Sequence, residues 1–364
     1  MLIAAVILIV TFSMIGEVKS IHGGHDDVNH RVNLLEQNTI PPTMNDWPGV
    51  AIEEIGHPLV RKGTSFVDDA RKLFLEYLDE FIAIYQARPD KVNRCGIRIN
   101  HAYALFLTIK VLQPTSIIES GVNAGQSTYF MRAASPVAHI YPIDPADEPI
   151  CDQGSRWIDS AADQNKSTYY TGSNFKDLGD IDWGSKIKSG EMDPQKTLVF
   201  LDDHCKVFDR WNVLMRYGFR HVMLEDNYKA GEGGTADDKL GWTPKQMLAC
   251  KDADAQFLWH SLESYAEFPP LVSAILSSGG QAIDGDRVHF QHPLDDNHDI
   301  NAPLLRPETS DADRVIYEDI CQRLGVDPKM KDDESFMQIL NYNQITYMEL
   351  RPGSPHLFSI LPKG

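Results

Sequence analysis

The stretch IIESGVNAGQST, residues 117–128, passes from an apolar segment through two glycines into a polar segment. This order predicts a buried strand, a tight turn and the first turn of a helix, whose backbone amides face a ligand. Asp144 follows 19 residues after Gly125, at the end of the next apolar segment, where a carboxylate accepts hydrogen bonds from ribose hydroxyls. The stretch therefore predicts a nucleotide-type binding turn. A turn that only packs a helix, followed by a strand-end aspartate, is the alternative.

Short apolar segments separated by helical ones continue along the chain, which is typical of a parallel sheet covered on both faces. We expect strands at residues 116–119, 139–143, 197–201, 221–224 and 345–350. We expect helices at residues 66–87, from about 100 to 112, and after Gly125, His204 and Pro244. The predicted fold class is α/β, with a doubly wound, mostly parallel Rossmann-like sheet, an N-terminal helical extension and an acidic insertion.

The chain divides by composition into five parts. They are a signal peptide or short signal anchor (1–20), an extension with an amphipathic helix (21–95), the Rossmann-like domain (96–350), an acidic insertion within it (about 281–340) and a tail (351–364). The insertion holds 14 acidic and 6 basic residues. Such an excess of one charge predicts a structural or solubilising role.

The first 15 residues carry no charged side chain. They fit the apolar core of a secretory signal, with Val18 and Ser20 as the small residues before a cleavage at Ile21. A short signal anchor and a buried apolar N-terminus are the alternatives. Asn165-Lys166-Ser167 is an N-glycosylation sequon. The sequence thus predicts the secretory pathway: a secreted protein or, if the N-terminus is a membrane anchor, one in the lumen of the endoplasmic reticulum or Golgi.

The charge balance excludes one class of partner. The chain has 34 basic and 52 acidic residues and a net charge of −18, so nucleic acids and anionic lipid surfaces meet a repulsive field. We expect no nucleic-acid partner, and the oligomeric state, including a homo-oligomer, stays open.

Carboxylates follow two further predicted strands. Because ligands bind beyond the carboxyl ends of parallel strands, these side chains and the glycine turn should share one edge. Hard oxygen ligands of this kind suit Mg²⁺. The candidate metal ligands are Asp202, Asp203, Glu225 and Asp226. His204 has an intrinsic pKa suited to a base near this edge. Helix N-caps and solvated acids are the alternative.

Together these runs, over roughly residues 96–350, resemble class I S-adenosylmethionine-dependent methyltransferases, especially the cephalosporin-hydroxylase-like and sugar O-methyltransferase branch. The resemblance implies S-adenosylmethionine as the cofactor and Mg²⁺ as a second one. It also implies that Asp203 or His204 assists deprotonation of the acceptor, and that Asp144 binds the ribose. Asn123 stands where many of these enzymes have a glycine. The implied cofactor-binding residues are Glu119, Gly121, Asn123, Gly125, Gln126, Ser127 and Asp144.

The leading hypothesis is therefore an O-methyltransferase acting on a small-molecule or carbohydrate hydroxyl. The loop at residues 229–241 would close over the site, and a surface loop without such a role is the alternative. Two other functions are kept. A secretory-pathway glycosyltransferase would use the DxD triplet Asp284-Gly285-Asp286 to hold a metal and a nucleotide sugar. A non-catalytic binding protein would keep the same fold without turnover.

Overall fold

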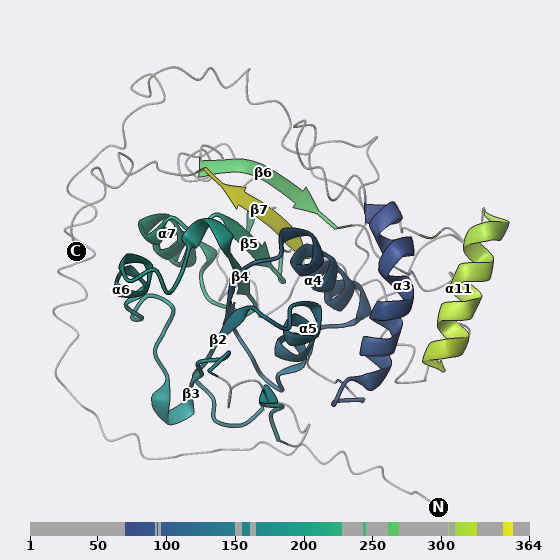
Figure 1. The fold of residues 1–364 in the computed structure, drawn as a ribbon, viewed down its shortest axis with the longest axis horizontal. Coiled ribbons are helices and arrows are strands. Elements are labelled where there is room, and N and C mark those ends of the chain that lie inside the picture. Colours follow the sequence, from purple (N-terminus) through teal and green to yellow (C-terminus); the bar gives the residue numbers. More distant parts are fainter. Residues whose placement is uncertain are drawn as a thin grey trace, which may run out of the picture. The chain divides into compact units, whose positions relative to one another are not determined.

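The sheet predicted from the apolar segments is present in the computed structural model (Figure 1). The structure describes residues 70–91, 93, 96–149, 155–160, 165–227, 243–244, 261–268, 305, 310–325 and 345–351. These residues form a sheet of seven strands in the order β3-β2-β1-β4-β5-β7-β6. The strands are β1 (Ser116–Ser120), β2 (His139–Asp144), β3 (Tyr170–Thr171), β4 (Thr197–Leu201), β5 (His221–Leu224), β6 (Leu262–Glu267) and β7 (Thr346–Leu350).

Pairing from β3 to β5 is parallel, whereas β7 runs antiparallel to both β5 and β6. The predicted mostly parallel, doubly wound α/β fold is confirmed. The five predicted strands are all present, and β3 and β6 were not predicted. The strand order reverses at β1, which lies between β2 and β4. The crevice beyond the ends of β1 and β4 is therefore where this fold binds ligands.

The predicted helices near residues 70–112 and after Gly125 and His204 are also present. The helix predicted from residue 66 is described from Ala70 on. The helix predicted after Pro244 lies outside the described residues, as does the loop at residues 229–241. The helices are α3 (Ala70–Ala87), α4 (Ile99–Leu112), α5 (Gln126–Ala134), α6 (Trp183–Lys188), α7 (Val207–Tyr217) and α11 (Asp311–Leu324).

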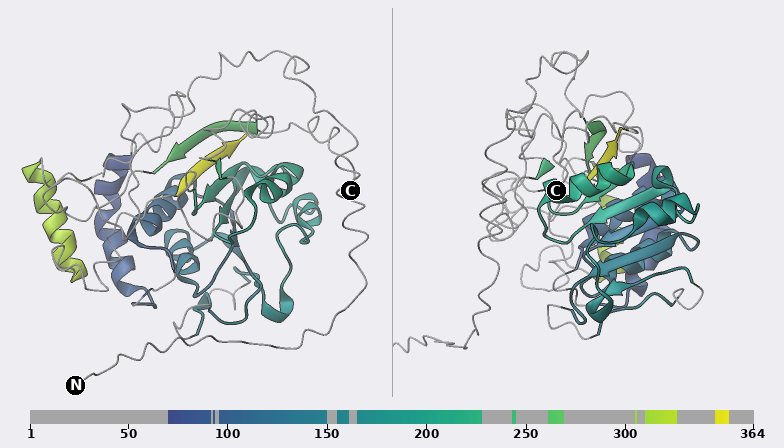
Figure 2. Two further views of the ribbon diagram at one scale, coloured as in Figure 1. Left: turned by 180° about the vertical axis from the view of Figure 1, so that it is seen from behind. Right: turned by 90° about the vertical axis from the view of Figure 1, so that its left-hand side faces the viewer.

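Helices cover both faces of the sheet (Figure 2). Neighbouring residues of a strand enter opposite cores, because successive side chains of a strand point to opposite faces. Ile117 packs in the core formed with α3, α4, α5 and α11, and Ile118 in the core formed with α6 and α7. Burial on both faces explains the continuous apolar segments that predicted the central strands.

Part of the acidic insertion belongs to the folded core. Helix α11 places Tyr317 and Ile320, both almost fully buried, in the core shared with α3 and α4. Arg323 of α11 donates to Asp79 of α3 at 2.7 Å. Except for the buried Asp313, the charged residues of this helix thus lie on the more solvated side of a packed element. The other residues of the insertion, apart from 305, 310 and 325, lie outside the described residues, as do the tail after residue 351 and the segment 1–69. Within the part of the chain that the structure describes, no helix has the length and hydropathy to cross a membrane.

Candidate active site

The ends of four strands, β1, β2, β4 and β5, are held together at one edge of the sheet. Beyond β1, the Gly121 amide donates to Ile143 O of β2 at 2.9 Å. The Asp202 amide donates to Ser120 O at 2.7 Å, and the Glu225 amide donates to Leu201 O at 3.0 Å. The glycine turn and both carboxylate segments therefore share one edge, as the sequence predicts. We call it the rim.

The turn after β1 is built from left-handed backbone conformations. Gly121 has φ +95°, Asn123 +44° and Gly125 +80°. Asparagine is among the few non-glycine residues that tolerate this region, so Asn123 keeps the conformation that a glycine would take. A Cβ on Gly121 would lie 2.1 Å from Asp202 O, and one on Gly125 would lie 2.4 Å from Trp157 O. Both positions require glycine, because the backbone of another segment lies too close to leave room for a Cβ atom.

Asp144 holds this turn from the end of β2. Its Oδ2 accepts hydrogen bonds from the amides of Val122 (2.9 Å) and Asn123 (2.8 Å), and its Oδ1 accepts one from the Ala146 amide (2.8 Å). The Arg156 guanidinium lies 3.4 Å from Oδ1. A carboxylate offers about four lone-pair sites, so these contacts engage most of its acceptor capacity. The residue predicted to bind ribose thus stabilises the binding turn.

Residues 155–160, between β2 and β3, cover the same turn, and we call them the clamp segment. Arg156 Nε donates to Asn123 O at 2.6 Å and Nη1 donates to Ala146 O at 3.0 Å. The Trp157 amide donates to Ala124 O at 2.9 Å. Sequence analysis missed these residues, because the clamp segment has neither periodicity nor a motif to single it out.

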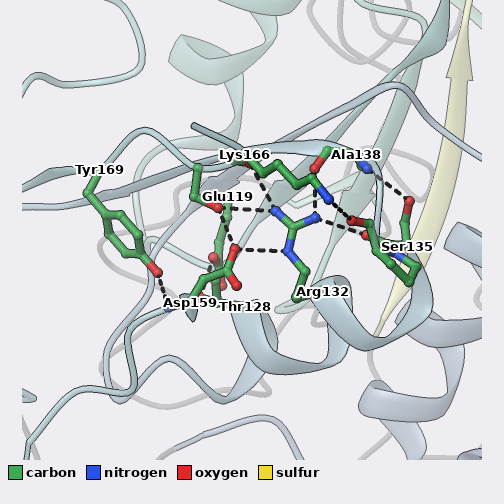
Figure 3. A network of polar contacts seen from close by, with 10 residues as sticks. Glu119, Thr128, Arg132, Ser135, Ala138, Asp159, Lys166 and Tyr169 are labelled. Atoms are coloured by element: carbon green, nitrogen blue, oxygen red, sulfur yellow. Dashed lines mark hydrogen bonds and ion pairs between the residues drawn. The ribbon is translucent and has the colours of Figure 1, made fainter. Parts of the chain in front are cut away.

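The clamp segment is also attached to α5, as Figure 3 shows. Arg132 Nε donates to Asp159 Oδ2 at 2.8 Å, and Ser167 Oγ donates to the same oxygen at 2.5 Å. The other nitrogens of the Arg132 guanidinium donate to the carbonyls of Ser135, Ala138 and Lys166. Asp159 is almost fully buried. Since buried charges require such partners, this network fixes the clamp segment to the helix that the turn begins.

Glu119, the fourth residue of β1, lies beneath the turn. Its fully buried carboxylate accepts hydrogen bonds from Ser127 Oγ at 2.5 Å and from Thr128 Oγ1 at 2.6 Å. Burial raises the pKa of Glu119 to about 7, against the opposing effect of the two hydroxyls. Gln126, also buried, donates through Nε2 to Ile97 O at 3.0 Å. These three predicted cofactor-binding side chains, Glu119, Gln126 and Ser127, anchor the start of α5.

Asp203 also bonds to its own scaffold. Its Oδ2 accepts hydrogen bonds from Ser120 Oγ (2.5 Å) and Arg210 Nε (2.8 Å), and its Oδ1 accepts one from the Cys205 amide (3.0 Å). Arg210 is held in turn by two hydrogen bonds to Asp177. Asp203 therefore joins the ends of β1 and β4 to α7.

Asp202, His204 and Asp226 come together at the rim, and we call them the acid–imidazole cluster. One ligand atom from each lies within 4.8 Å of the others, close enough to hold one metal ion. His204 Nδ1 lies 2.9 Å from Asp226 Oδ2. This contact with Asp226 raises the pKa of His204 to about 9. Loss of hydration and the charge of Asp226 raise the pKa of Asp202 well above its usual value. Because the negative charges of two neighbouring carboxylates repel each other, such a pair favours the binding of a cation.

Glu225, another predicted metal ligand, is not part of this cluster and contacts a residue of α4. Its Oε1 lies 2.5 Å from Nδ1 of His101, a fully buried residue of α4. Burial lowers the pKa of His101 to about 3, and burial together with Asp226 raises that of Glu225. Both shifts favour the neutral forms of the two side chains. Sequence analysis missed His101, although a histidine within an almost wholly apolar helix is a signal.

The comparisons with known proteins concern the fold. No protein-family description and no curated protein sequence matches the chain. Among solved structures, the chain is similar to CmcI at 13% identity, over 46% of this chain and 63% of that one, with a TM-score of 0.30. It is also similar to an O-methyltransferase from Bacillus cereus in complex with S-adenosylhomocysteine (14% identity, 43% and 66% covered, TM-score 0.25). A third similar structure is the S-adenosylhomocysteine-bound methyltransferase PaMTH1 of Podospora anserina (11% identity, 66% and 84% covered, TM-score 0.27).

The chain thus spans less than two thirds of the CmcI chain. A further CmcI structure carries Mg and S-adenosylmethionine. At these identities and TM-scores the likeness carries no argument about this chain, whose fold and chemistry rest on its own residues.

Proposed function

We propose that the protein is an S-adenosylmethionine-dependent O-methyltransferase that acts on a hydroxyl of a small molecule or sugar with the help of Mg²⁺. One observation carries the proposal. At the point where the strand order reverses, a single rim joins the glycine turn and the start of α5 to the acid–imidazole cluster. A methyl donor and a metal-assisted acceptor would bind at these two neighbouring places.

The start of α5 suits the carboxylate of an amino-acid-like cofactor. The helix begins after Gly125, and no side chain of the described residues caps its first amides. Such amides, together with the helix dipole, attract an anion. Gly121, Asn123 and Gly125 would shape this site through their backbone, and Glu119, Gln126 and Ser127 would hold it from beneath. For Asp144 we propose mainly the positioning of the turn, with the ribose contact as a further prediction.

The acid–imidazole cluster suits the divalent ion. Mg²⁺ is usually held by one or two carboxylates and keeps several waters, so Asp202 and Asp226 would bind it. Glu225 would support the site from behind through Asp226. We assign Asp203 to the scaffold, because its oxygens already accept three hydrogen bonds.

His204 is our candidate base. When bound, S-adenosylmethionine supplies an activated methyl group and Mg²⁺ supplies positive charge beside the acceptor oxygen. The His204 side chain is 52% exposed and lies beside Asp226. With its pKa raised to about 9 it carries a proton at neutral pH. The positive charge of a cation on Asp226 would repel that proton and leave the imidazole able to accept one from the acceptor hydroxyl.

The test is thermal unfolding of the full chain with S-adenosylhomocysteine or UDP, each with Mg²⁺ or EDTA. A ligand at 100 times its dissociation constant stabilises the native state by about 2.7 kcal/mol. We expect the midpoint to rise with S-adenosylhomocysteine and not with UDP. A rise with UDP and metal alone would overturn the proposal in favour of a nucleotide-sugar enzyme.

The metal part has its own test. Asp226→Asn keeps the size of the side chain and removes the charge, so we expect at least a tenfold loss of Mn²⁺ affinity, measured by electron paramagnetic resonance. Asp209→Asn, on the exposed first turn of α7, is the control and should bind Mn²⁺ as the wild type does. Equal affinities of the Asp226 variant and the wild type would remove the metal from the proposal.

The two other functions have distinct signatures. The DxD triplet of the glycosyltransferase alternative, Asp284-Gly285-Asp286, lies outside the described residues, so the UDP measurement decides it. A non-catalytic protein would bind S-adenosylhomocysteine and transfer no methyl group to any of a panel of hydroxyl acceptors.

We further propose that the chain enters the secretory pathway through residues 1–20. The apolar N-terminal sequence supports this, and Asn165 of the sequon is exposed, as a glycan would require. Peptide mapping of the protein expressed in a eukaryotic secretory host should find an N-terminus at Ile21, or at Met1 with membrane association if the segment is an anchor. An intact N-terminus on a cytosolic protein would contradict the proposal.

A further inference from the structure

The acid–imidazole cluster is connected to the interior by an unbroken series of side-chain contacts. His101 Nδ1 lies 2.5 Å from Glu225 Oε1. The Glu225 carboxyl is hydrogen-bonded to that of Asp226, and Asp226 Oδ2 lies 2.9 Å from His204 Nδ1. The series begins at a fully buried ring on α4 and ends at a half-exposed ring on the rim.

The backbone of Glu225 is held by the neighbouring strand β4, and its side chain is held by the distant residue His101. Glu225 follows directly after β5, and its amide donates to Leu201 O of β4 at 3.0 Å. Its side chain, which has three rotatable bonds, is oriented by a residue 124 positions earlier in the chain. Asp226 lies beside Glu225 and is itself almost fully buried. The direction in which Asp226 presents its oxygens therefore depends on where His101 holds Glu225.

We propose that His101 is a positioning residue for the metal-binding carboxylates, acting through Glu225 on Asp226. The proposal rests on the proposed function and assigns a role to α4, a helix that carries none of the predicted site residues. Hydrogen-bonding partners behind the ligands typically change metal affinity by 10- to 100-fold when removed. His101 Nδ1 bonds to Glu225, which adjoins the metal-binding acids. We therefore expect substitution of His101 to lower the affinity for the metal and to leave the glycine turn intact.

Two substitutions separate this role from simple packing. The amide of asparagine reaches the position of Nδ1 of a histidine, whereas that of glutamine reaches the position of Nε2. We therefore expect His101→Asn to keep the contact with Glu225 and to retain Mn²⁺ affinity within about threefold. We expect His101→Gln to lose the contact and at least tenfold in Mn²⁺ affinity, read by electron paramagnetic resonance.

Thr108→Val on the same helix is the matched control. Thr108 is fully buried, and its hydroxyl donates to Ala104 O of α4 at 2.8 Å. This variant perturbs α4 without removing the partner of Glu225, so we expect unchanged Mn²⁺ affinity even if the unfolding midpoint falls.

The outcomes separate this proposal from the proposed function. Equal Mn²⁺ affinities of His101→Asn and His101→Gln would overturn the role of His101, and so would absence of Mn²⁺ binding by the wild type. Binding of S-adenosylhomocysteine is measured on the same samples and should stay within about twofold in both variants. If the wild type binds Mn²⁺ in a His101-dependent way but binds no S-adenosylhomocysteine, the methyltransferase proposal fails and the role of His101 stands.

Discussion

At the scale of single residues, five of the six acids predicted to bind the cofactor or a metal divide into two groups, and the sixth, Glu225, contacts His101. Glu119, Asp144 and Asp203 accept hydrogen bonds from the chain itself, and Asp202 and Asp226 lie together beside an imidazole. The sequence predicts that all five lie near the rim, because each follows or ends a strand. It does not predict which way each side chain turns, since this depends on local geometry such as the left-handed conformation of His204 (φ +51°).

Glu119 predicts a pH dependence of stability. Its pKa is raised from 4.5 to about 7 in the folded protein, so the folded state binds the proton more tightly than the unfolded state. The contribution to stability is complete below about pH 4.5 and is lost as the pH rises through 7. Glu119→Gln stays neutral, so the wild type should lose about 3 kcal/mol relative to this variant between pH 4.5 and 8.

The free energies of unfolding of the wild type and Glu119→Gln are measured with urea between pH 4.5 and 8. Glu191→Gln is the control, because the Lys186 hydrogen bond lowers the pKa of Glu191. Replacing this carboxylate should therefore not make the variant more stable than the wild type as the pH rises. A constant difference between wild type and Glu119→Gln at all pH values would contradict the prediction.

Asp144→Ala leaves two amides of the glycine turn, those of Val122 and Asn123, without their acceptor. Unsatisfied buried donors cost about 1–3 kcal/mol each, so the variant should be less stable by about 2–6 kcal/mol. It should also lose S-adenosylhomocysteine binding, measured by calorimetry. Asp182→Ala removes an exposed acceptor of a helix amide away from the site, and it should lose a little stability and no affinity. Wild-type affinity in Asp144→Ala would show that the carboxylate is not needed for the cofactor.

At the scale of elements, the strands that sequence analysis found and missed differ in burial. The central strands β1 and β4 are buried at every residue, which gives continuous apolar runs. β3 and β6 are the two edge strands of the sheet. β3 has two residues, and β6 reads LESYAE, in which polar and apolar residues mix. An edge strand has no need of apolar residues on both faces, so its sequence carries a weaker signal.

Because the ends of β1 and β4 lie close together, we expect two glycine substitutions to lower the free energy of unfolding by different amounts. In Gly121→Ala the new Cβ would meet Asp202 O at 2.1 Å, whereas in Gly218→Ala it would meet nothing within 4 Å. Both residues have a left-handed φ, which costs alanine about 1–2 kcal/mol. Overpacking adds about 1–3 kcal/mol for Gly121→Ala alone.

Urea unfolding of the two variants should therefore give a clearly larger loss for Gly121→Ala. It should also displace Asp202 and reduce Mn²⁺ affinity, which Gly218→Ala should leave unchanged. Equal losses of stability would mean that the ends of β1 and β4 separate easily.

At the scale of the whole molecule, sequence analysis predicted the fold class and the edge of the sheet that carries the site. It did not predict the contacts that complete the site from a distance. His101 reaches Glu225 from α4, and Arg156 reaches Asn123 from the clamp segment. Such pairs depend on how elements pack in three dimensions, and neither local periodicity nor spacing along the chain encodes them.

The position of β7 has a consequence for synthesis on the ribosome. β5, which carries Glu225 and Asp226 at its end, pairs on its outer side with β7, and β7 ends at Leu350. At about 5–20 residues per second, translation from the end of β5 to the start of β7 takes on the order of 10 s. Throughout that interval β5 is an uncovered edge of the nascent sheet, open to pairing with other chains. The strand that carries two of the site's acids is thus among the last to be enclosed, and a chaperone that shields sheet edges during translation should raise the yield of folded protein.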